Sequence, residues 1–390
     1  MKVRSRIFKI VTAIGCFAYT SAGAAAPVND RQDDIRKIVD AQIHPEMKKM
    51  HIPGMAVGIA LDGKEYVFNY GVSSKANQKS VTDNTLFEIG SVSKTFTATL
   101  ASYAQIDGKL ALSDRTSKYL PFFKDSPFGN LRLLNLGTHT PGGLPLQLPA
   151  KVTNNAQLQT YLKQWQPSCE PGKFRTYNNP GIGMLGLIAA QSLNKKFDVL
   201  MEKTIFPALG MKDSYINVPQ SQMANYAQGY TENDQPTRVT EALLSDQAYG
   251  VKTTATDLLR FVEANMGTIK VDETVQRAIT ATHTGYFKVG VMTQDLIWEQ
   301  YHYPVALKTL LEGNAPSMIF QANKVSEITP PQAPLEDVWI NKTGSTNGFS
   351  AYAAFIPKRK MAIVILANKS YPIKDRVTIA HQILQELKSN

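Results

Sequence analysis

The first stretch able to do chemistry is residues 87–99, where Ser91 and Lys94 lie three positions apart in the run Phe-Glu-Ile-Gly-Ser-Val-Ser-Lys. The Gly-Ser step opens an apolar, helix-prone segment, so Ser91 is expected at or just inside a helix N-terminus. Lys94 then lies one turn later, with its amine beside the Ser91 hydroxyl. A serine with an amine close enough to take its proton is an activated nucleophile. The spacing alone is weak evidence, because Ser192 and Lys195 repeat it at what reads as an ordinary helix end.

Two further stretches supply polar groups that such a nucleophile could use. Tyr177 and Asn179 stand two residues apart in a turn-prone loop that could project a phenol and an amide into a cleft. Lys342 and Thr343 come just before an alternating strand, so they are predicted to flank a sheet edge. Gly344 follows them, and a glycine there would let a substrate approach the backbone.

A third stretch is the loop 142–147, in which the Gln147 amide could meet a polar ligand. Each of these signals is weak when taken singly, and Tyr215 with Asn217 repeats the Tyr-x-Asn spacing without an evident role. Their order along the chain, Ser-x-x-Lys, Tyr-x-Asn and Lys-Thr-Gly, makes a joint motif accident improbable.

Other chemistries find no support in the sequence. The histidines form no His-x-x-x-His pair and the cysteines do not cluster, so no metal and no cofactor are expected. Gly-x-Ser-x-Gly is absent around Ser91, which leaves a Ser-His-Asp triad unsupported. His139, just before the Gln147 loop, reads as a loop-packing residue. The net charge of +10 is scattered rather than gathered in a Lys/Arg block, so no nucleic-acid partner is expected.

The elements that must position these residues come from both ends of the chain. The predicted elements are a helix over 30–50, a hairpin over 55–61 and 64–70, a second hairpin over 350–356 and 361–367, and a helix over 374–387. Strands just inside both termini suggest one shared sheet. We therefore predict an α+β fold, in which an α/β sandwich domain of antiparallel sheet flanked by helices is built from residues 25–90 and 201–390. A mostly helical domain, residues 91–200, is inserted, with the active site in the cleft between the two.

Residues 1–24 are predicted to be a cleavable signal peptide, which implies a periplasmic protein. Four basic residues precede an apolar stretch over 10–19 and small residues over 21–26, with cleavage expected after Ala24. The apolar stretch is too short to span a bilayer, and a lipoprotein signal at Cys16 lacks the larger aliphatic residue expected three positions earlier. Cleavage lowers the formal charge from +10 to +6 and leaves Cys169 as the single cysteine, so no intramolecular disulfide can form. No membrane association is expected after cleavage, and nothing indicates other than a monomer.

Taken together, these motifs resemble those of the serine β-lactamases of class C, the AmpC-type cephalosporinases. Class A enzymes and penicillin-binding proteins carry Ser-Asp-Asn at the middle place, where this chain has Tyr-Asn-Asn at 177–179. The likeness covers nearly the whole mature chain, including residues 52–57, 87–99, 142–147, 248–252, 342–349 and 366–369. It implies a serine β-lactamase/D,D-peptidase-like fold, with cephalosporins and penicillins as substrates and resistance to these β-lactam antibiotics as the consequence of their hydrolysis.

By this resemblance, Ser91 attacks the β-lactam carbonyl and forms an acyl-enzyme. Either Lys94 or Tyr177 is the base for acylation, and the sequence does not choose between them. Tyr177 is the expected activator of the hydrolytic water, and Lys342 completes the catalytic set. The backbone N–H groups of Ser91 and Ser345 are the expected oxyanion donors.

The resemblance also implies a set of substrate-binding residues. Lys342 and Thr343, with Arg376 further off, are expected to face the substrate carboxylate. Asn179 and Gln147 would hold the side-chain amide of the substrate. The remaining members of the implied set are Tyr249, which lines the pocket opposite, together with Gly344, Ser345 and Asn347.

The chain departs from the family pattern at positions that are not catalytic. The departures are Asn178 in place of Ser, Ala150 in place of Asp, Glu241 and Ala242 in place of Pro-Gly, and Asp295 and Ile297 in place of Gly. Larger residues at glycine positions can shift the backbone or crowd a neighbour. They bear on the substrate profile more than on the reaction class.

The nearest alternative is a penicillin-binding D,D-peptidase or an esterase of the same fold. The run Leu-Gly-Thr-His-Thr at 136–140 favours it, whereas the intact Lys-Thr-Gly motif and Gln147 favour a lactamase. The two differ in deacylation, because a peptidase traps penicillin and a lactamase releases it. A penicillin sensor without catalysis is a more distant alternative, since the chain shows no tether or partner domain and retains both Tyr177 and Lys342.

Overall fold

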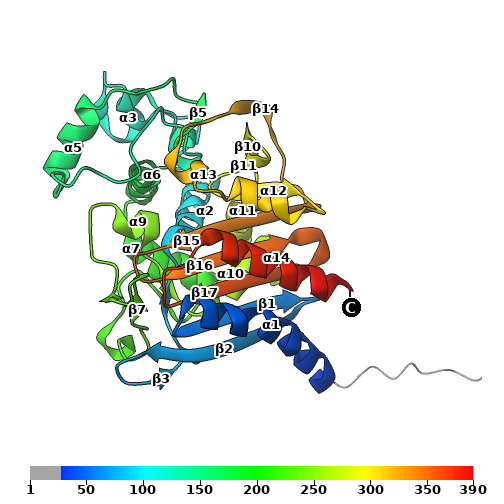
Figure 1. The fold of residues 1–390 in the computed structure, drawn as a ribbon. Coiled ribbons are helices and arrows are strands. Elements are labelled where there is room, and N and C mark those ends of the chain that lie inside the picture. The colour runs from blue at the N-terminus through cyan, green and yellow to red at the C-terminus, as the bar shows by residue number, and fades with distance from the viewer. Residues whose placement is uncertain (1–27, 390) are drawn as a thin grey trace, which may run out of the picture.

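The computed structural model describes residues 28–389, so the predicted signal peptide lies outside the described residues. Its central feature is an antiparallel sheet of ten strands with helices on both faces, which confirms the predicted α+β class (Figure 1). In spatial order the strands are β14 (Ser326–Gln332), β10 (Gly285–Val289), β11 (Met292–Gln294), β12 (Glu299–His302), β15 (Val338–Ser345), β16 (Ser350–Ile356), β17 (Met361–Ala367), β1 (Gly54–Leu61), β2 (Lys64–Ser74) and β3 (Lys79–Ser80).

Both predicted hairpins are present and meet in the middle of this sheet. Asp62 and Gly63 adopt positive φ angles of 52° and 76°, the geometry of the two-residue turn whose twist matches that of the strands. This turn sets the register that pairs Leu61 with Lys64. The strand β17 of the C-terminal hairpin pairs with β1 of the N-terminal hairpin, so the two ends of the chain do share one sheet.

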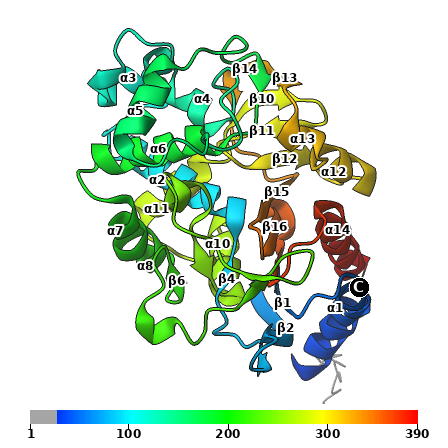
Figure 2. The same cartoon turned by 60° about the vertical axis from the view of Figure 1, so that its left-hand side comes forward.

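The middle strands are buried on both faces because helices cover both. The helices α1 (Val28–Met50) and α14 (Ile373–Ser389) lie side by side on one face, and α10 (Ala255–Met266) lies against the other (Figures 1 and 2). Every residue of β1, β16 and β17 is buried. A strand covered on both faces reads as a continuous apolar run, and β17 does so as Met-Ala-Ile-Val-Ile-Leu-Ala.

A long buried helix, α2 (Ser93–Ile106), carries the nucleophile motif into the core. Eleven of its fourteen residues are buried, and it packs between α6 (Asn179–Ser192), α11 (Glu273–Ala281) and α9 (Ser245–Tyr249). A helix that is enclosed on all sides in this way belongs to the interior of the protein. The packing around α2 also fixes its first turn, which includes Lys94.

The remaining elements are short. The further helices are α3 (Thr116–Tyr119), α4 (Leu133–Gly137), α5 (Asn155–Gln164), α7 (Phe197–Leu200), α8 (Phe206–Ala208), α12 (Leu307–Gly313) and α13 (Ser317–Phe320). The further strands are β5 (Phe174–Arg175) paired with β13 (Asn323–Lys324), β4 (Phe87–Glu88), β9 (Lys252–Thr253) and β6 (Ser214–Tyr215) in one small sheet, and β7 (Gly229–Tyr230) paired with β8 (Pro236–Thr237).

The segment 91–200 is mostly helical, with β5 as its one strand among these described residues. Its separation from the rest of the chain as a domain stays a prediction. No helix within residues 28–389 is long and apolar enough to cross a membrane.

Candidate active site

Ser91 lies in a single 3-10 turn, Gly90–Val92, that leads directly into α2. It is partly exposed, whereas Lys94 one turn later is fully buried. The Lys94 Nζ donates to the Ser91 Oγ at 2.8 Å and to the Ala248 carbonyl oxygen at 2.7 Å. The second contact fixes the lysine from α9, so the amine is aimed at the serine from a preset position. By contrast, Ser192 and Lys195 sit at the end of α6, where the Ser192 hydroxyl donates to a helix carbonyl.

Two glycines let the Ser91 turn and the end of β15 approach backbone to backbone. Gly90 has a φ of 50°, and a β-carbon there would lie 2.5 Å from the backbone nitrogen of Ser345. A β-carbon on Gly344 would overlap the carbonyl oxygen of Ile89. This contact brings the backbones of Ser91 and Ser345 together, as two oxyanion donors require. It also corrects the expected reason for Gly344, whose missing side chain faces the Ser91 turn rather than a substrate.

Tyr177 lies between β5 and α6 with its ring among three cations. The ring centroid is 5.3 Å from the Lys94 Nζ, 5.3 Å from the Lys342 Nζ and 5.4 Å from the Arg175 guanidinium carbon. The side chain is only 7% exposed, so water screens these charges poorly. Three positive charges around one phenol favour its ionised form.

The pKa values of Lys94 and Tyr177 are both lowered toward neutral pH. Burial lowers the pKa of Lys94 to about 8, and the charge of Lys342 acts in the same direction. Burial of Tyr177 opposes ionisation, but the charges of Lys342 and Lys94, with hydrogen bonding to Ser91, outweigh it and lower the pKa of Tyr177 to about 8. Either side chain is therefore able to accept a proton near neutral pH, and both alternatives for the acylation base stay open.

Behind Lys342, a buried ion cluster joins β5, β12 and β15. One carboxylate oxygen of Glu299 accepts from the Arg175 Nη2 at 2.9 Å and lies 3.6 Å from the Lys342 Nζ. The other oxygen accepts from the Asn341 Nδ2 at 3.3 Å. Arg175 is anchored further by Gln294, whose Oε1 accepts from its Nε at 2.7 Å. Arg175 and Lys342 together carry one more charge than Glu299 can balance, so a net positive charge remains beside Tyr177.

A second buried carboxylate, Glu88, ties together segments around the site. It is 1% exposed and accepts hydrogen bonds from the Tyr226 hydroxyl at 2.5 Å and the Val239 N–H at 2.7 Å. Its other oxygen accepts from the Thr346 hydroxyl at 2.6 Å. Glu88 thus links the strand that enters the Ser91 turn to the residues that follow Ser345.

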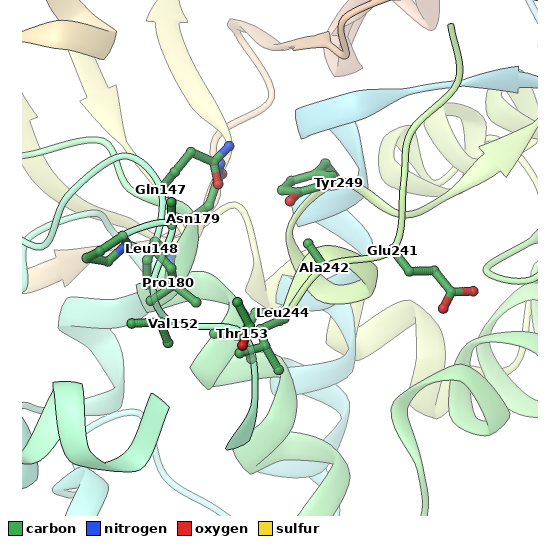
Figure 3. A pocket seen from close by; sticks show the side chains of 13 residues that line it. Gln147, Leu148, Val152, Thr153, Asn179, Pro180, Glu241, Ala242, Leu244 and Tyr249 are labelled. Carbon is green, nitrogen blue, oxygen red and sulfur yellow. The ribbon is translucent and has the colours of Figure 1, made fainter. Parts of the chain in front are cut away.

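Three of the predicted binding residues line one cavity of about 320 Å³. Gln147 and Asn179 lie together on one wall and Tyr249 stands across from them (Figure 3). The segment that contains Glu241 and Ala242 forms part of the same wall as Tyr249. The other lining residues are Leu148, Pro149, Ala150, Val152, Thr153, Pro180, Leu243 and Leu244.

The other predicted binding residues lie on β15 or just after it. Lys342 and Thr343 lie within this inner strand, which pairs with β12 and β16, and not just before a strand at a sheet edge as predicted. Thr343 is buried on the strand, while Ser345 and Asn347 are exposed at its end and in the following turn. Arg376, which is expected to face the substrate carboxylate from further off, is 2% exposed and donates to the carbonyl oxygen of Gly344 at 2.5 Å. It also donates to the Ser345 Oγ at 2.9 Å. The physical reason is that α14 covers the far face of the sheet, so an arginine on it reaches β15 from behind.

Three residues of the site were not recognised as functional in the sequence. Arg175 stands two positions before Tyr177, and this proximity was the only available signal. Glu299 lies more than 120 residues from Arg175 and has no local motif. Glu88 belongs to the nucleophile stretch itself, yet its partners come from three other segments of the chain.

Comparisons with known proteins show similarity over most of the chain. The sequence model of the Beta-lactamase family matches residues 39–388. A beta-lactamase of Pseudomonas fluorescens is 49% identical over 354 residues, which cover 91% of this chain and 99% of that protein. The solved structure of a D-alanine carboxypeptidase AmpC from Burkholderia cenocepacia is 56% identical with a TM-score of 0.88, over 91% of this chain and 99% of that one. A class C beta-lactamase in complex with cefoxitin is 52% identical with a TM-score of 0.89, over 91% of this chain and 99% of that chain.

Proposed function

Because this chain belongs to the beta-lactamase family, we propose that it is a class C serine β-lactamase that hydrolyses the β-lactam amide of cephalosporins and penicillins and so gives resistance to them. The observation that carries the proposal is the Ser91 hydroxyl held 2.8 Å from the buried Lys94 amine. Tyr177 and Lys342 complete the catalytic set. The reaction class is that of hydrolases acting on cyclic amides, EC 3.5.2.6.

In the acylation step, the Ser91 oxygen attacks the lactam carbonyl carbon while its proton passes to Lys94 or Tyr177. The oxyanion that forms accepts hydrogen bonds from the backbone N–H groups of Ser91 and Ser345. The carbon–nitrogen bond then breaks, and the ring nitrogen takes up the proton from the base. The product of this step is an ester between the opened β-lactam and Ser91.

In the deacylation step, water attacks the ester carbonyl and gives a proton to Tyr177. The second tetrahedral intermediate uses the same two N–H donors. It collapses with release of the Ser91 oxygen, which regains a proton, and the ring-opened acid leaves. A pKa of Tyr177 near 8 supports this role, because the phenol can then lose and regain a proton near neutral pH.

Substrate contacts follow from the cavity and from β15. Gln147 and Asn179 offer amides for the acylamino side chain of the substrate, with Tyr249 opposite. Lys342, Thr343 and the exposed Asn347 offer groups for its carboxylate. Arg376 donates hydrogen bonds to the Gly344 carbonyl oxygen and to the Ser345 hydroxyl. It therefore supports Ser345 from behind the strand.

The proposal extends to the location and state of the protein. Export through the 1–24 signal, with cleavage after Ala24, would deliver the enzyme to the periplasm, where β-lactams meet the cell. Within residues 28–389, Cys169 is the one free cysteine. The mature enzyme is proposed to act as a monomer without a cofactor.

The test is steady-state hydrolysis of a chromogenic cephalosporin by the mature protein, with and without EDTA, beside Ser91→Ala and Ser192→Ala. Ser192 is the matched control, because it has the same Ser-x-x-Lys spacing at a helix end. We expect rapid turnover that is lost in Ser91→Ala, kept in Ser192→Ala and indifferent to EDTA. Turnover that survives in Ser91→Ala would contradict the serine mechanism.

A D-alanyl-D-alanine peptidase is the second candidate, and the name of the Burkholderia relative favours it. Both activities begin with acylation of the same serine. A single burst of one equivalent that then stops would support the peptidase, because that enzyme does not release the penicilloyl group. Continued turnover after the burst supports the lactamase.

A further inference from the structure

His139, which the sequence presents as a packing residue, makes contacts with three consecutive residues of the Tyr177 loop. It follows α4, is fully buried, and has a φ of 58°, a left-handed conformation that histidine adopts more readily than most non-glycine residues. Its ring lies on the Tyr177 ring with centroids 4.2 Å apart and planes tilted by 38°. The contact covers one face of the phenol that the proposed mechanism uses.

The two neighbours of Tyr177 are bound by the same histidine. The Thr176 N–H donates to the His139 carbonyl oxygen at 2.8 Å. The Asn178 N–H donates to the His139 Nδ1 at 3.4 Å, a long bond that still requires a lone pair on that nitrogen. One residue therefore holds the backbone before and after Tyr177 and the ring in between.

This bond to Asn178 sets the chemical form of the imidazole. Because Nδ1 accepts, the proton of the neutral ring is on Nε2, which is buried without a hydrogen-bond partner. A protonated ring would lose the Asn178 bond and add a positive charge beside three existing cations. Burial, with the charges of Arg175, Lys94 and Lys342, holds the pKa of His139 well below its usual value.

Other contacts of the Tyr177 side chain are made at its hydroxyl, which hydrogen-bonds with Ser91 and Lys94, whereas His139 contacts the ring and the backbone on both sides. Asn178 caps α6, accepting from the Gly181 N–H at 2.8 Å, so the chain turns sharply just after Tyr177. The surrounding cations attract the phenol as well. The proton-accepting oxygen must stay within reach of Ser91 and of the attacking water.

We propose that His139 is a positioning residue that clamps the Tyr177 loop and so keeps the phenol in place for deacylation. The proposal rests on the proposed β-lactamase function and deepens it. Acylation can proceed with Lys94 as the base, whereas hydrolysis of the acyl-enzyme depends on Tyr177. Loss of the clamp should therefore slow the second step more than the first.

The experiment is rapid-mixing kinetics of a chromogenic cephalosporin with the mature wild type and three variants. His139→Ala removes the ring and the acceptor; His139→Asn keeps an acceptor near the place of Nδ1 and tolerates positive φ; His139→Phe keeps a ring but no acceptor. His283→Phe is the matched control, because His283 is also a buried histidine packed on aromatic rings, far along the chain from Tyr177.

For His139→Ala we expect a burst near one equivalent per enzyme, followed by turnover roughly 10- to 100-fold slower than in the wild type, the usual effect of misplacing a catalytic group by about 1 Å. The KM should fall together with kcat, since the acyl-enzyme accumulates. His139→Asn should recover most of the turnover and His139→Phe less. The control should turn over like the wild type.

Two results would overturn the proposal. One is wild-type turnover in His139→Ala. The other is a burst that shrinks in proportion to the turnover, because this would mean that only the fraction of folded enzyme had changed. A wild-type protein that stops after one equivalent would contradict the lactamase function itself, and with it a role for His139 in deacylation.

Discussion

Two groups of buried ionisable side chains in this protein differ in what stands next to them. At the active site, Lys94, Lys342 and Arg175 surround Tyr177, and the buried carboxylate of Glu299 lies 3.6 Å from the Lys342 Nζ. Directly after β11, the Asp295 carboxyl is fully buried, and neither of its oxygens has a hydrogen-bond partner. Burial is similar in the two places, but the surrounding charge is not.

The comparison shows that the charges around a buried group decide whether its shifted pKa can serve catalysis. At the active site, burial lowers the pKa of the Lys94 amine, whereas the charges of Lys342 and Lys94 outweigh burial and lower the pKa of the Tyr177 phenol. Both pKa values are then about 8, so a proton can pass between the two groups near neutral pH. At Asp295, burial outweighs the charge of Lys288 and raises the pKa well above its usual value, and the carboxyl group has no hydrogen-bond partner. The first arrangement supports catalysis, and the second lowers stability.

Removing a cation from the site should have the largest effect. We expect Lys342→Met to lower kcat roughly 100- to 1000-fold, the usual loss when a preorganised electrostatic contact is removed. The pKa of Tyr177 should rise toward its ordinary value, so the remaining activity should increase at alkaline pH. Pre-steady-state and steady-state rates measured across pH check both expectations.

The matched control for that variant is Lys369→Met, because Lys369 is also a buried lysine but pairs with Asp234 at 2.7 Å outside the site. It should keep wild-type kinetics. An unchanged pH profile in Lys342→Met would show that the charge of Lys342 does not set the proton affinity of Tyr177.

Neutralising the carboxylate of the site should act in the opposite direction on Tyr177. The charge of Glu299 opposes ionisation of the phenol, so Glu299→Gln should lower the pKa of Tyr177 further and move the pH–rate profile of deacylation to lower pH. Arg175 and Lys342 would then face each other without a counter-ion, and unfolding free energy should fall by about 3 kcal/mol. Denaturant unfolding beside the pH profile measures the two effects; a profile that shifts upward would contradict the account.

At the contrasting position, removing the charge should stabilise the protein. The folded state keeps the Asp295 proton that the unfolded chain releases above about pH 4, so stability falls as pH rises through that value. Asp295→Asn lacks this loss and should gain roughly 1–2 kcal/mol at pH 7, with a smaller gain at pH 4. Asp257→Asn is the control, because that buried carboxylate accepts bonds from Asp213 and Ser214 and its loss should destabilise.

The smallest effect is expected at Glu263, another buried carboxyl group, where the charge of Arg260 does not outweigh burial and the neighbouring Glu65. Burial, with a hydrogen bond and charge from Glu65, raises the pKa of Glu263 to about 8. Stability should therefore decline as pH rises from about 4 to about 8, since the unfolded chain ionises first. Glu263→Gln should flatten this decline in urea unfolding series at pH 5 and pH 8. An equal gain at both values would mean that the carboxyl does not titrate in this range.

Much of the fold could be predicted because it depends on local signals. The Asp62-Gly63 turn and the apolar runs on either side define one hairpin, and the C-terminal hairpin has the same character. The strand β15 was not predicted, because Lys342 and Thr343 were expected just before a strand and not within one. The strands β10, β11, β12 and β14 were not predicted either. They are short or largely polar, and pairing with β15 and with one another, rather than local propensity, makes them strands.

In the active site, too, the residues that could be predicted are those that local motifs mark. Ser91, Lys94, Tyr177 and Lys342 stood in short motifs whose order along the chain is informative. Glu299 acts from a distant strand and could not be found locally. The role of His139 depends on its contacts with residues nearly 40 positions away, and the reverse-side position of Arg376 depends on where α14 packs.

Surrounding cations, not burial, decide the proton affinity of Tyr177. The most direct measurement is an NMR titration of protein labelled with ¹³C at the tyrosine ζ carbons, with the Tyr177 signal identified by its absence in Tyr177→Phe. The account predicts a pKa of about 8 for this tyrosine, which moves upward in Lys342→Met. A Tyr177 signal that titrates at or above pH 10, as an ordinary phenol does, would contradict it.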